Sequence, residues 1–376
     1  MKKYGNVCCL LVFLLALLSA AGCREGEKPL PTLRLGHAPH DHHSPLYIAA
    51  MNPDYFKANG GIYLKETVFR QEYLLVDRDR PLAKVVIDAS TGGNELIRKL
   101  SEGLFDMCFG GVPAMLSFID QGSPIRMVAP VMADGTGLVI RRDLPAEDWQ
   151  QFLAFIRQSG KPVKIGYKFA VSVQNLLFEQ ALRESGISFS EDEKDRAAQV
   201  RLVNLYGEKN VIPVLENGLV DGVVIMQPYL AMAQERGIGK VIIMLRDLPP
   251  AGKWQGSPCC ALAASDAFAA DHPEVAQAMV TLMLRSIAFI NLDPAGSAQQ
   301  IAQWLNTSPA VEMKSIPTIR FEQDYSEDWE RGISFWTETM IRSGLLTGKV
   351  KEAYDRGNLD RVIYNRELFD KAKENL

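Results

Sequence analysis

The sequence lacks the local patterns that mark several classes of enzyme. It contains no GxSxG elbow, no HExxH pair, no P-loop and no GxGxxG stretch, so the motifs of α/β-hydrolases, zinc proteases and nucleotide-binding proteins are missing. No CxxC pair is present either, which removes the basis for a zinc ribbon or a dithiol redox site. We therefore expect that the chain is not an enzyme.

An excess of charge of one sign is also missing. The formal net charge is −4, with acidic and basic residues interspersed along the chain, so there is no basic field for nucleic acid and no acidic tail. We expect no nucleic-acid partner.

The apolar run near the N-terminus is too short to cross a membrane. It extends from Val7 to Leu18, whereas a spanning helix needs roughly 20 residues. Lys2 and Lys3 precede it and small residues follow it, which is the order of a secretory signal. Residues 1–22 are thus predicted to be a signal peptide, and residues 23–31 a linker.

A cysteine directly follows the small residues Ala-Ala-Gly, in the arrangement of a bacterial lipobox. Acylation of Cys23 would then anchor the exported chain to a membrane on its periplasmic or extracellular face. Ala20 stands where a lipobox usually has leucine, so a plain signal peptide is the alternative.

Cysteine is scarce beyond this point. Of six cysteines, only Cys108, Cys259 and Cys260 follow Cys23, and an odd number leaves at least one thiol outside an internal disulfide. Cys259 and Cys260 lie in an apolar stretch, which favours buried structural thiols.

Short β-branched runs alternate with longer segments of helical period, an order typical of α/β proteins. Strands are predicted at 32–36, 84–88, 105–109, 125–129, 163–166, 201–205, 222–226 and 241–245, and extended crossings at 138–140 and 259–263. Two crossings make the first of two lobes discontinuous. Lobe 1 is predicted to comprise residues 32–137 plus 257–345, lobe 2 residues 138–256, and a C-terminal helical extension residues 346–376.

Four stretches resemble the periplasmic solute-binding proteins of nitrate-, sulfonate- and taurine-type ABC importers. They are Ser44 to Ala49, Gly92 to Ala114, Leu215 to Tyr229, and Phe268 to Pro294. The resemblance implies the type II periplasmic-binding-protein fold, with two lobes that are each a mainly parallel sheet flanked by helices, joined by hinge crossings near 137–142 and 257–264. It also implies a monomer without a cofactor that binds a small anionic solute and delivers it to a permease and ATPase complex. A ligand-sensing module of a signalling system would share the fold.

In such sheets the ligand lies at the carboxyl ends of the strands, where helix N-termini suit a small anion. The aromatic residues Tyr47, Tyr167 and Trp254 are expected to cover any apolar part of the ligand. The predicted ligand contacts are His40, Asp41, His42, His43, Ser44, Tyr47, Ser90, Thr91, Gly92, Gly93, Asn94, Gly110 and Gly111 from lobe 1, and Tyr167, Lys168, Ser172, Tyr206, Gln227 and Trp254 from lobe 2.

Four of the five histidines, His37, His40, His42 and His43, fall within one short segment after the first predicted strand. They could bind an oxyanion directly, with a charge that varies near neutral pH. Alternatively, His40, His42 and His43 could ligate a transition metal such as zinc in a metal-binding lipoprotein. The third alternative is a set of exposed loop histidines that contact nothing.

Overall fold

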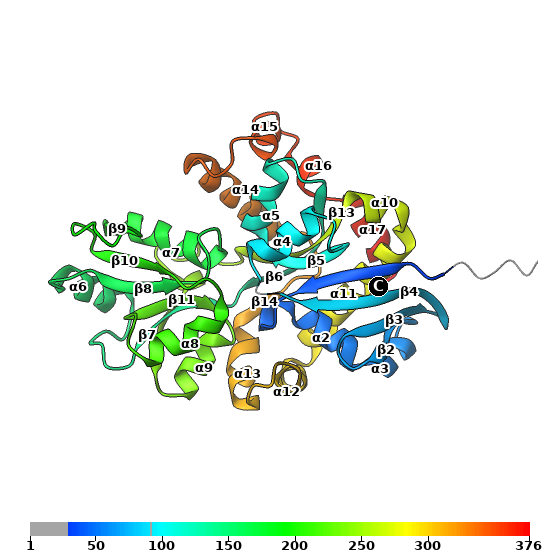
Figure 1. The fold of residues 1–376 in the computed structure, drawn as a ribbon, viewed down its shortest axis with the longest axis horizontal. Coiled ribbons are helices and arrows are strands. Elements are labelled where there is room, and N and C mark those ends of the chain that lie inside the picture. The colour runs from blue at the N-terminus through cyan, green and yellow to red at the C-terminus, as the bar shows by residue number, and fades with distance from the viewer. Residues whose placement is uncertain (1–28, 91) are drawn as a thin grey trace, which may run out of the picture. The chain divides into compact units, whose positions relative to one another are not determined.

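Two β-sheets organise the chain in a computed structural model that describes residues 29–90 and 92–376 (Figure 1). The predicted signal peptide, the predicted acylation site Cys23 and Thr91 lie outside the described residues. Residues Thr32 to Leu376 form one compact unit, and the fold below is the fold of this unit. The predicted α/β class is confirmed.

The first sheet has eight strands in the order β14-β6-β13-β5-β1-β4-β3-β2. Only the centre is parallel, where β1 pairs with β4 and β5; the other pairs are antiparallel. The sheet is thus less parallel than expected, because short turns join β2, β3 and β4 into a meander and the returning strand β13 runs against its neighbours. Its strands are β1 Thr32–His37, β2 Ile62–Val68, β3 Glu72–Asp77, β4 Arg80–Ala89, β5 Met107–Gly111, β6 Ile125–Asp134, β13 Pro258–Ser265 and β14 Ile319–Phe321.

The second sheet has six strands in the order β12-β7-β11-β8-β10-β9. Strands β8, β9, β10 and β11 are parallel, whereas β7 runs against both of its neighbours. The strands are β7 Thr136–Arg141, β8 Val163–Tyr167, β9 Phe189–Ser190, β10 Val200–Asn204, β11 Gly222–Met226 and β12 Gly239–Met244, and the helices beside them are α6 Trp149–Gln158, α7 Val173–Glu184, η2 Glu208–Asn210, α8 Val211–Glu216, α9 Tyr229–Glu235 and η3 Leu245–Asp247.

Most of the remaining helices belong with the first sheet, and α13 also packs against α9 beside the second sheet. The long helix α11 packs on strands of this sheet and on α2 and α17; it is apolar and long enough to cross a membrane, yet 67% of its most apolar window is buried inside the protein. These helices are η1 Asp41–His43, α2 Ser44–Met51, α3 Pro53–Ala58, α4 Asn94–Ser101, α5 Val112–Asp120, α10 Asp266–Asp271, α11 Pro273–Leu292, α12 Pro294–Leu305, α13 Pro309–Ser315, η4 Ile316–Thr318, α14 Glu327–Arg342, α15 Lys349–Asp355, α16 Leu359–Ile363 and α17 Arg366–Lys373.

The chain passes between the sheets twice, but not where it was expected to. Residues 138–140 lie within β7 and residues 259–263 within β13, because these buried extended runs satisfy their backbone groups by pairing inside a sheet. The first passage is the single residue Gly135 between β6 and β7, and the second is the segment 248–257. We call residues 32–134 and 258–376 the first half and residues 136–247 the second half.

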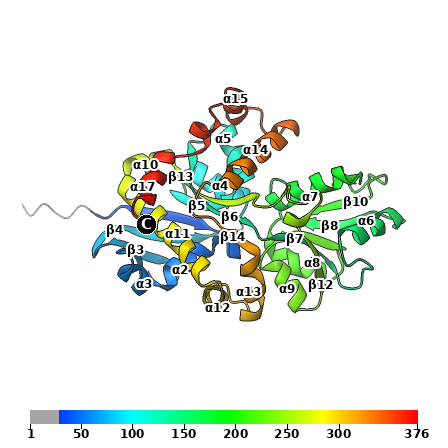
Figure 2. The same ribbon diagram turned by 180° about the vertical axis from the view of Figure 1, so that it is seen from behind.

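The predicted C-terminal extension is part of the first half. Tyr364 bridges to Met127 of β6, and α17 packs against α11. The carboxylate of Asp120 also accepts hydrogen bonds from backbone N–H groups at the start of α15, including those of Gly348 and Val350 at 3.0 Å each. Figure 2 shows these helices against the same half as β5 and β13.

Candidate functional site

The histidine segment lies in the interior of the protein. After β1 the chain turns through His40 into η1 and α2, and the exposed fractions of His40, His42 and His43 are 4%, 1% and 1%. The hydroxyl of Tyr47 accepts the backbone N–H of His40 (3.2 Å) and lies 2.8 Å from the carbonyl oxygen of Ala38. The alternative of exposed histidines that contact nothing is therefore wrong, because this turn folds inward.

The three histidines face a small cavity between the two halves. The free space amounts to about 40 Å³, enough for a few water molecules or an ion. Both halves supply lining residues. Those of the first half are His40, His42, His43, Gly93, Gly110, Gly111, Ala114, Cys259 and Cys260, and those of the second half are Lys168, Phe169, Val171, Ser172, Val173, Gln174 and Met226.

Strand ends bring these residues together. Gly110 and Gly111 end β5, Lys168 follows β8, and Met226 ends β11. The helices α5 and α7 begin at the cavity, with Gly111 and Ser172 as their N-caps. The positive dipole end of one helix from each half thus lies at the same space.

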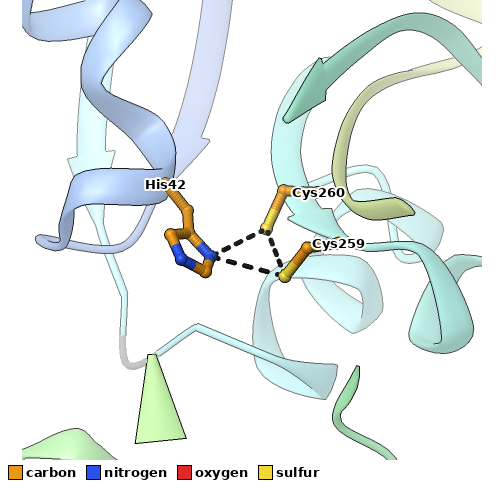
Figure 3. Close-up of side chains that lie close together, drawn as sticks. All are labelled: His42, Cys259 and Cys260. Carbon is orange, nitrogen blue, oxygen red and sulfur yellow. Dashed lines mark hydrogen bonds between the residues drawn. The ribbon is translucent and has the colours of Figure 1, made fainter. Parts of the chain in front are cut away.

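Two cysteines that sequence reasoning assigned to the core line this cavity beside His42. The Nδ1 atom of His42 lies 3.4 Å from the Sγ atom of Cys259 and 3.9 Å from that of Cys260, and the two sulfurs are 3.9 Å apart. Figure 3 shows the imidazole ring directed at both sulfurs. Both cysteines are buried, as predicted, but the apolar residues around them gave no sign that their thiols meet a histidine.

The ring of His42 is oriented by a hydrogen bond on its other side. Its Nε2 atom lies 3.2 Å from the carbonyl oxygen of Gly135. A carbonyl oxygen only accepts, so Nε2 carries the proton and Nδ1 presents a lone pair to the sulfurs. The two thiols differ in acidity, because hydrogen bonding between them raises the pKa of Cys259 and lowers that of Cys260.

Burial keeps the neighbouring histidines neutral. It lowers the pKa of His37 to about 3, that of His40 well below its usual value, and that of His43 in the same direction. The Nδ1 atom of His43 accepts the backbone N–H of Ala38 at 2.9 Å, which leaves the proton on Nε2. These rings therefore act at neutral pH as hydrogen-bonding groups and not as cations.

Lys168 is the charged residue that lines the cavity, and the carboxylate of Glu208 balances its charge. Its Nζ atom lies 2.8 Å from an Oε2 atom of Glu208, and both side chains are buried. The ammonium group reaches the first half, since a Cβ atom placed on Gly92 would lie 2.6 Å from Nζ. A buried ion pair therefore stands at the boundary between the halves.

Asp41 does not reach the cavity. Its side chain is buried beneath the histidines, beside Glu312 and hydrogen-bonded to Ser315. Burial raises the pKa of both carboxyl groups, so this acid pair can share a proton. A role for Asp41 as a direct ligand contact has no geometric support.

Several other predicted contacts do not line the cavity. Trp254 was expected to cover a ligand but is 1% exposed, with its Nε1 group donating to the carbonyl oxygen of Pro249 (3.1 Å). Tyr206 is 79% exposed, and Tyr47 stacks on Trp304. The further residues in this set are Ser44 and Asn94, which begin α2 and α4; Ser90, bonded to Lys99; Gly92, beside Lys168; Tyr167, bonded to Glu191; and Gln227, bonded to Thr318.

The cavity therefore gathers eight of the predicted contacts: His40, His42, His43, Gly93, Gly110, Gly111, Lys168 and Ser172. Sequence reasoning missed Gln174, whose Nε2 group donates to the sulfur of Cys259 at 3.9 Å. Its position two residues after the N-cap of α7 was the available signal, because the first turn of that helix faces the cavity.

A model of the NMT1-like family matches residues 26–306. Among curated proteins, the chain is 32% identical over 144 residues to the uncharacterized protein MJ1180 of Methanocaldococcus jannaschii, a match that covers 38% of this chain and 98% of that protein.

Three solved structures have a similar fold. The zinc-bound ligand-binding component of an ABC-type import system from Staphylococcus aureus has a TM-score of 0.69 at 16% identity, covering 91% of this chain and 99% of that one. The alkanesulfonate-binding protein SsuA of Xanthomonas axonopodis, bound to MOPS, has a TM-score of 0.63 at 16% identity, covering 85% and 96%. The nitrate-binding protein NrtA of Synechocystis has a TM-score of 0.69 at 13% identity, covering 92% and 89%. The chain therefore has the periplasmic-binding-protein fold, as its resemblance implied.

Proposed function

The chain belongs to the NMT1-like family, and on this premise we propose that it is the substrate-binding component of an ABC importer. It would take a small solute into the cavity and deliver it to a permease and ATPase complex. The observation that carries the proposal is that polar side chains from both halves line one cavity: His40, His43 and Cys260 from the first, and Lys168, Ser172 and Gln174 from the second. A solute held by both halves favours the closed arrangement over an open one.

Two features limit the size and charge of this solute. The free space of about 40 Å³ admits an ion or a group of a few atoms. The helix N-termini at Gly111 and Ser172 favour an anionic group such as nitrate, sulfonate or carboxylate, while Glu208 already balances the charge of Lys168. A singly charged anion fits this field better than a multiply charged one.

A matched pair of glutamines on α7 tests the cavity. Gln174 lines it, whereas Gln180 of the same helix bonds to Glu184 on the outside. A thermal-shift screen over nitrate, sulfonates, carboxylates and metal ions should find a solute that raises the melting temperature, because it binds only the folded chain.

Gln174→Ala should reduce that shift, and Gln180→Ala should leave it unchanged. A shift that survives Gln174→Ala, or that disappears equally in both variants, would place the solute elsewhere.

We also propose that the chain is exported and is anchored through Cys23. The fold shared with periplasmic binding proteins supports export. Anchoring would hold the receptor close to the importer, since a chain with two or more acyl groups stays on a membrane.

A further inference from the structure

We infer that His42, Cys259 and Cys260 form a three-ligand site for a thiophilic transition-metal ion such as Zn²⁺. The site lies inside the cavity described above. The inference rests on the proposed function only for the fate of the metal, which would be cargo for the importer or the anchor of a chelated solute; the site itself stands on geometry.

The three ligand atoms already have the spacing of a tetrahedral metal site. With bonds of about 2.3 Å from zinc to sulfur and about 2.0 Å to nitrogen, two sulfurs should lie about 3.8 Å apart and a sulfur and a nitrogen about 3.5 Å apart. The observed separations are 3.9 Å between the sulfurs, and 3.4 and 3.9 Å from the sulfurs to Nδ1 of His42. An ion could enter with ligand movements of a few tenths of an ångström.

A β-bulge explains how two adjacent cysteines can face the same point. In a regular strand neighbouring side chains point to opposite faces. The pairing of β13 with β6 shifts register between Pro258 and Cys260 and again between Cys260 and Ala261, so Cys259 has no partner in β6. Bulges of this kind re-aim side chains at functional sites, and here the bulge directs both sulfurs toward His42.

The surroundings match the usual outer shell of a metal site. A histidine that ligates a metal through one ring nitrogen donates its other N–H to a carbonyl or carboxylate, as Nε2 of His42 does to Gly135. The Nε2 group of His43, which also lines the cavity, is buried without a hydrogen-bond partner. Such an N–H group is available to donate to a thiolate ligand or to a group bound to the metal.

The fourth coordination position opens into the cavity. The three protein ligands line the cavity, and so does His40, whose Nδ1 atom is buried without a hydrogen-bond partner. Three ligands with an open position distinguish this site from a closed structural zinc site. Water or a donor atom of a chelating solute could complete the coordination. Thiolate and imidazole together favour zinc, copper and cobalt over magnesium or calcium.

Cobalt substitution tests the site directly. Titrating the reduced, metal-free protein with Co²⁺ should give one equivalent of binding, with a sulfur-to-cobalt charge-transfer band and the intense visible bands of tetrahedral cobalt. Zn²⁺ should displace the ion and abolish both. X-ray absorption of the unmodified zinc-loaded protein should show two sulfur neighbours at about 2.3 Å, a measurement that needs no variant to fold.

Two matched controls are present in the chain. Cys259→Ser, Cys260→Ser and His42→Asn should each weaken binding by at least roughly 100-fold, more than an outer-shell change does. Cys108→Ser, whose thiol faces the carbonyl oxygen of Leu96 instead, and His272→Asn, at the start of α11, should bind as the parent does.

The outcomes separate this inference from the proposed function. If nitrate, a sulfonate or a carboxylate stabilises the protein while Co²⁺ and Zn²⁺ do not bind, the metal site is wrong and the receptor function stands. Metal binding that persists without both cysteines, or an absorption spectrum without sulfur neighbours, also overturns the site. If neither metals nor anions bind, both proposals fail.

Discussion

At the scale of single residues, Lys168 and Glu208 show how a buried charge affects the free energy of unfolding. Their ion pair is buried where the halves meet. Removing one partner of such a pair leaves an uncompensated buried charge, which costs about 3–5 kcal/mol. Lys168→Met should therefore lower the free energy of unfolding in urea by about that amount.

The double variant Lys168→Met with Glu208→Gln should recover most of the loss, because no charge then remains unpaired. A double variant as unstable as the single one would show that Lys168 acts through packing alone.

His37 predicts a dependence of stability on pH. Burial holds its pKa at about 3 in the folded chain, against a usual value of 6.5. The unfolded chain thus binds the proton first, so this contribution to stability is complete above pH 6.5 and is lost as the pH falls from 6.5 toward 3. The loss is at most about 1.4 kcal/mol per pH unit. The groups facing the ring are the hydroxyl of Tyr47, 3.4 Å from Nδ1, and His43.

His37→Phe keeps an aromatic ring against Tyr47 and removes the titrating group. In urea unfolding between pH 7 and 4, this variant should lose stability more slowly with falling pH than the parent does. Equal slopes would contradict the buried neutral state of His37.

At the scale of elements, Gly135 links β6 to β7 and holds His42. Its φ angle is +65°, and an added Cβ atom would lie 2.7 Å from Cγ1 of Ile319 and 2.9 Å from Nε2 of His42. Gly135→Ala should therefore cost stability of about 1–2 kcal/mol for the backbone alone, and should also displace the imidazole and weaken Co²⁺ binding.

Gly122→Ala is the matched control. Its φ angle is also positive, at +92°, but nothing lies within 4 Å of the added Cβ atom. It should show the backbone cost in thermal unfolding while Co²⁺ binding stays at the parental level. Equal Co²⁺ affinity in the two alanine variants would show that Gly135 does not position His42 for metal binding.

The elements show how far periodicity predicts structure. The run from Gly222 to Met226 was predicted as a strand and is β11, because a short apolar β-branched run is buried on both faces. Strand β2 was missed: its first three residues are buried and its last four are exposed, so it shows neither alternation nor a continuous apolar run. The crossings were misplaced because a buried extended run looks the same whether it links two sheets or completes one.

At the scale of the whole molecule, export and anchoring lead to a prediction about Cys23, which lies outside the described residues. If Cys23 is acylated, the parent protein should sediment with membranes after cell fractionation, and Cys23→Ser should move it to the soluble exported fraction. The folded unit from Thr32 onward should keep its melting temperature, which serves as the control. A variant that stays with the membranes would contradict lipid anchoring.

The sequence by itself determined the α/β class, the placement of most strands and the histidine segment after β1, since these follow from local period and composition. It also predicted a site at the carboxyl ends of strands, which is where the cavity lies. Only the tertiary structure decided which side chains share the cavity. His42 and Cys259 are 217 residues apart, and their meeting depends on strand order and on one bulge in β13. No local pattern encodes either of these, because both arise from pairing between strands that are distant in the chain.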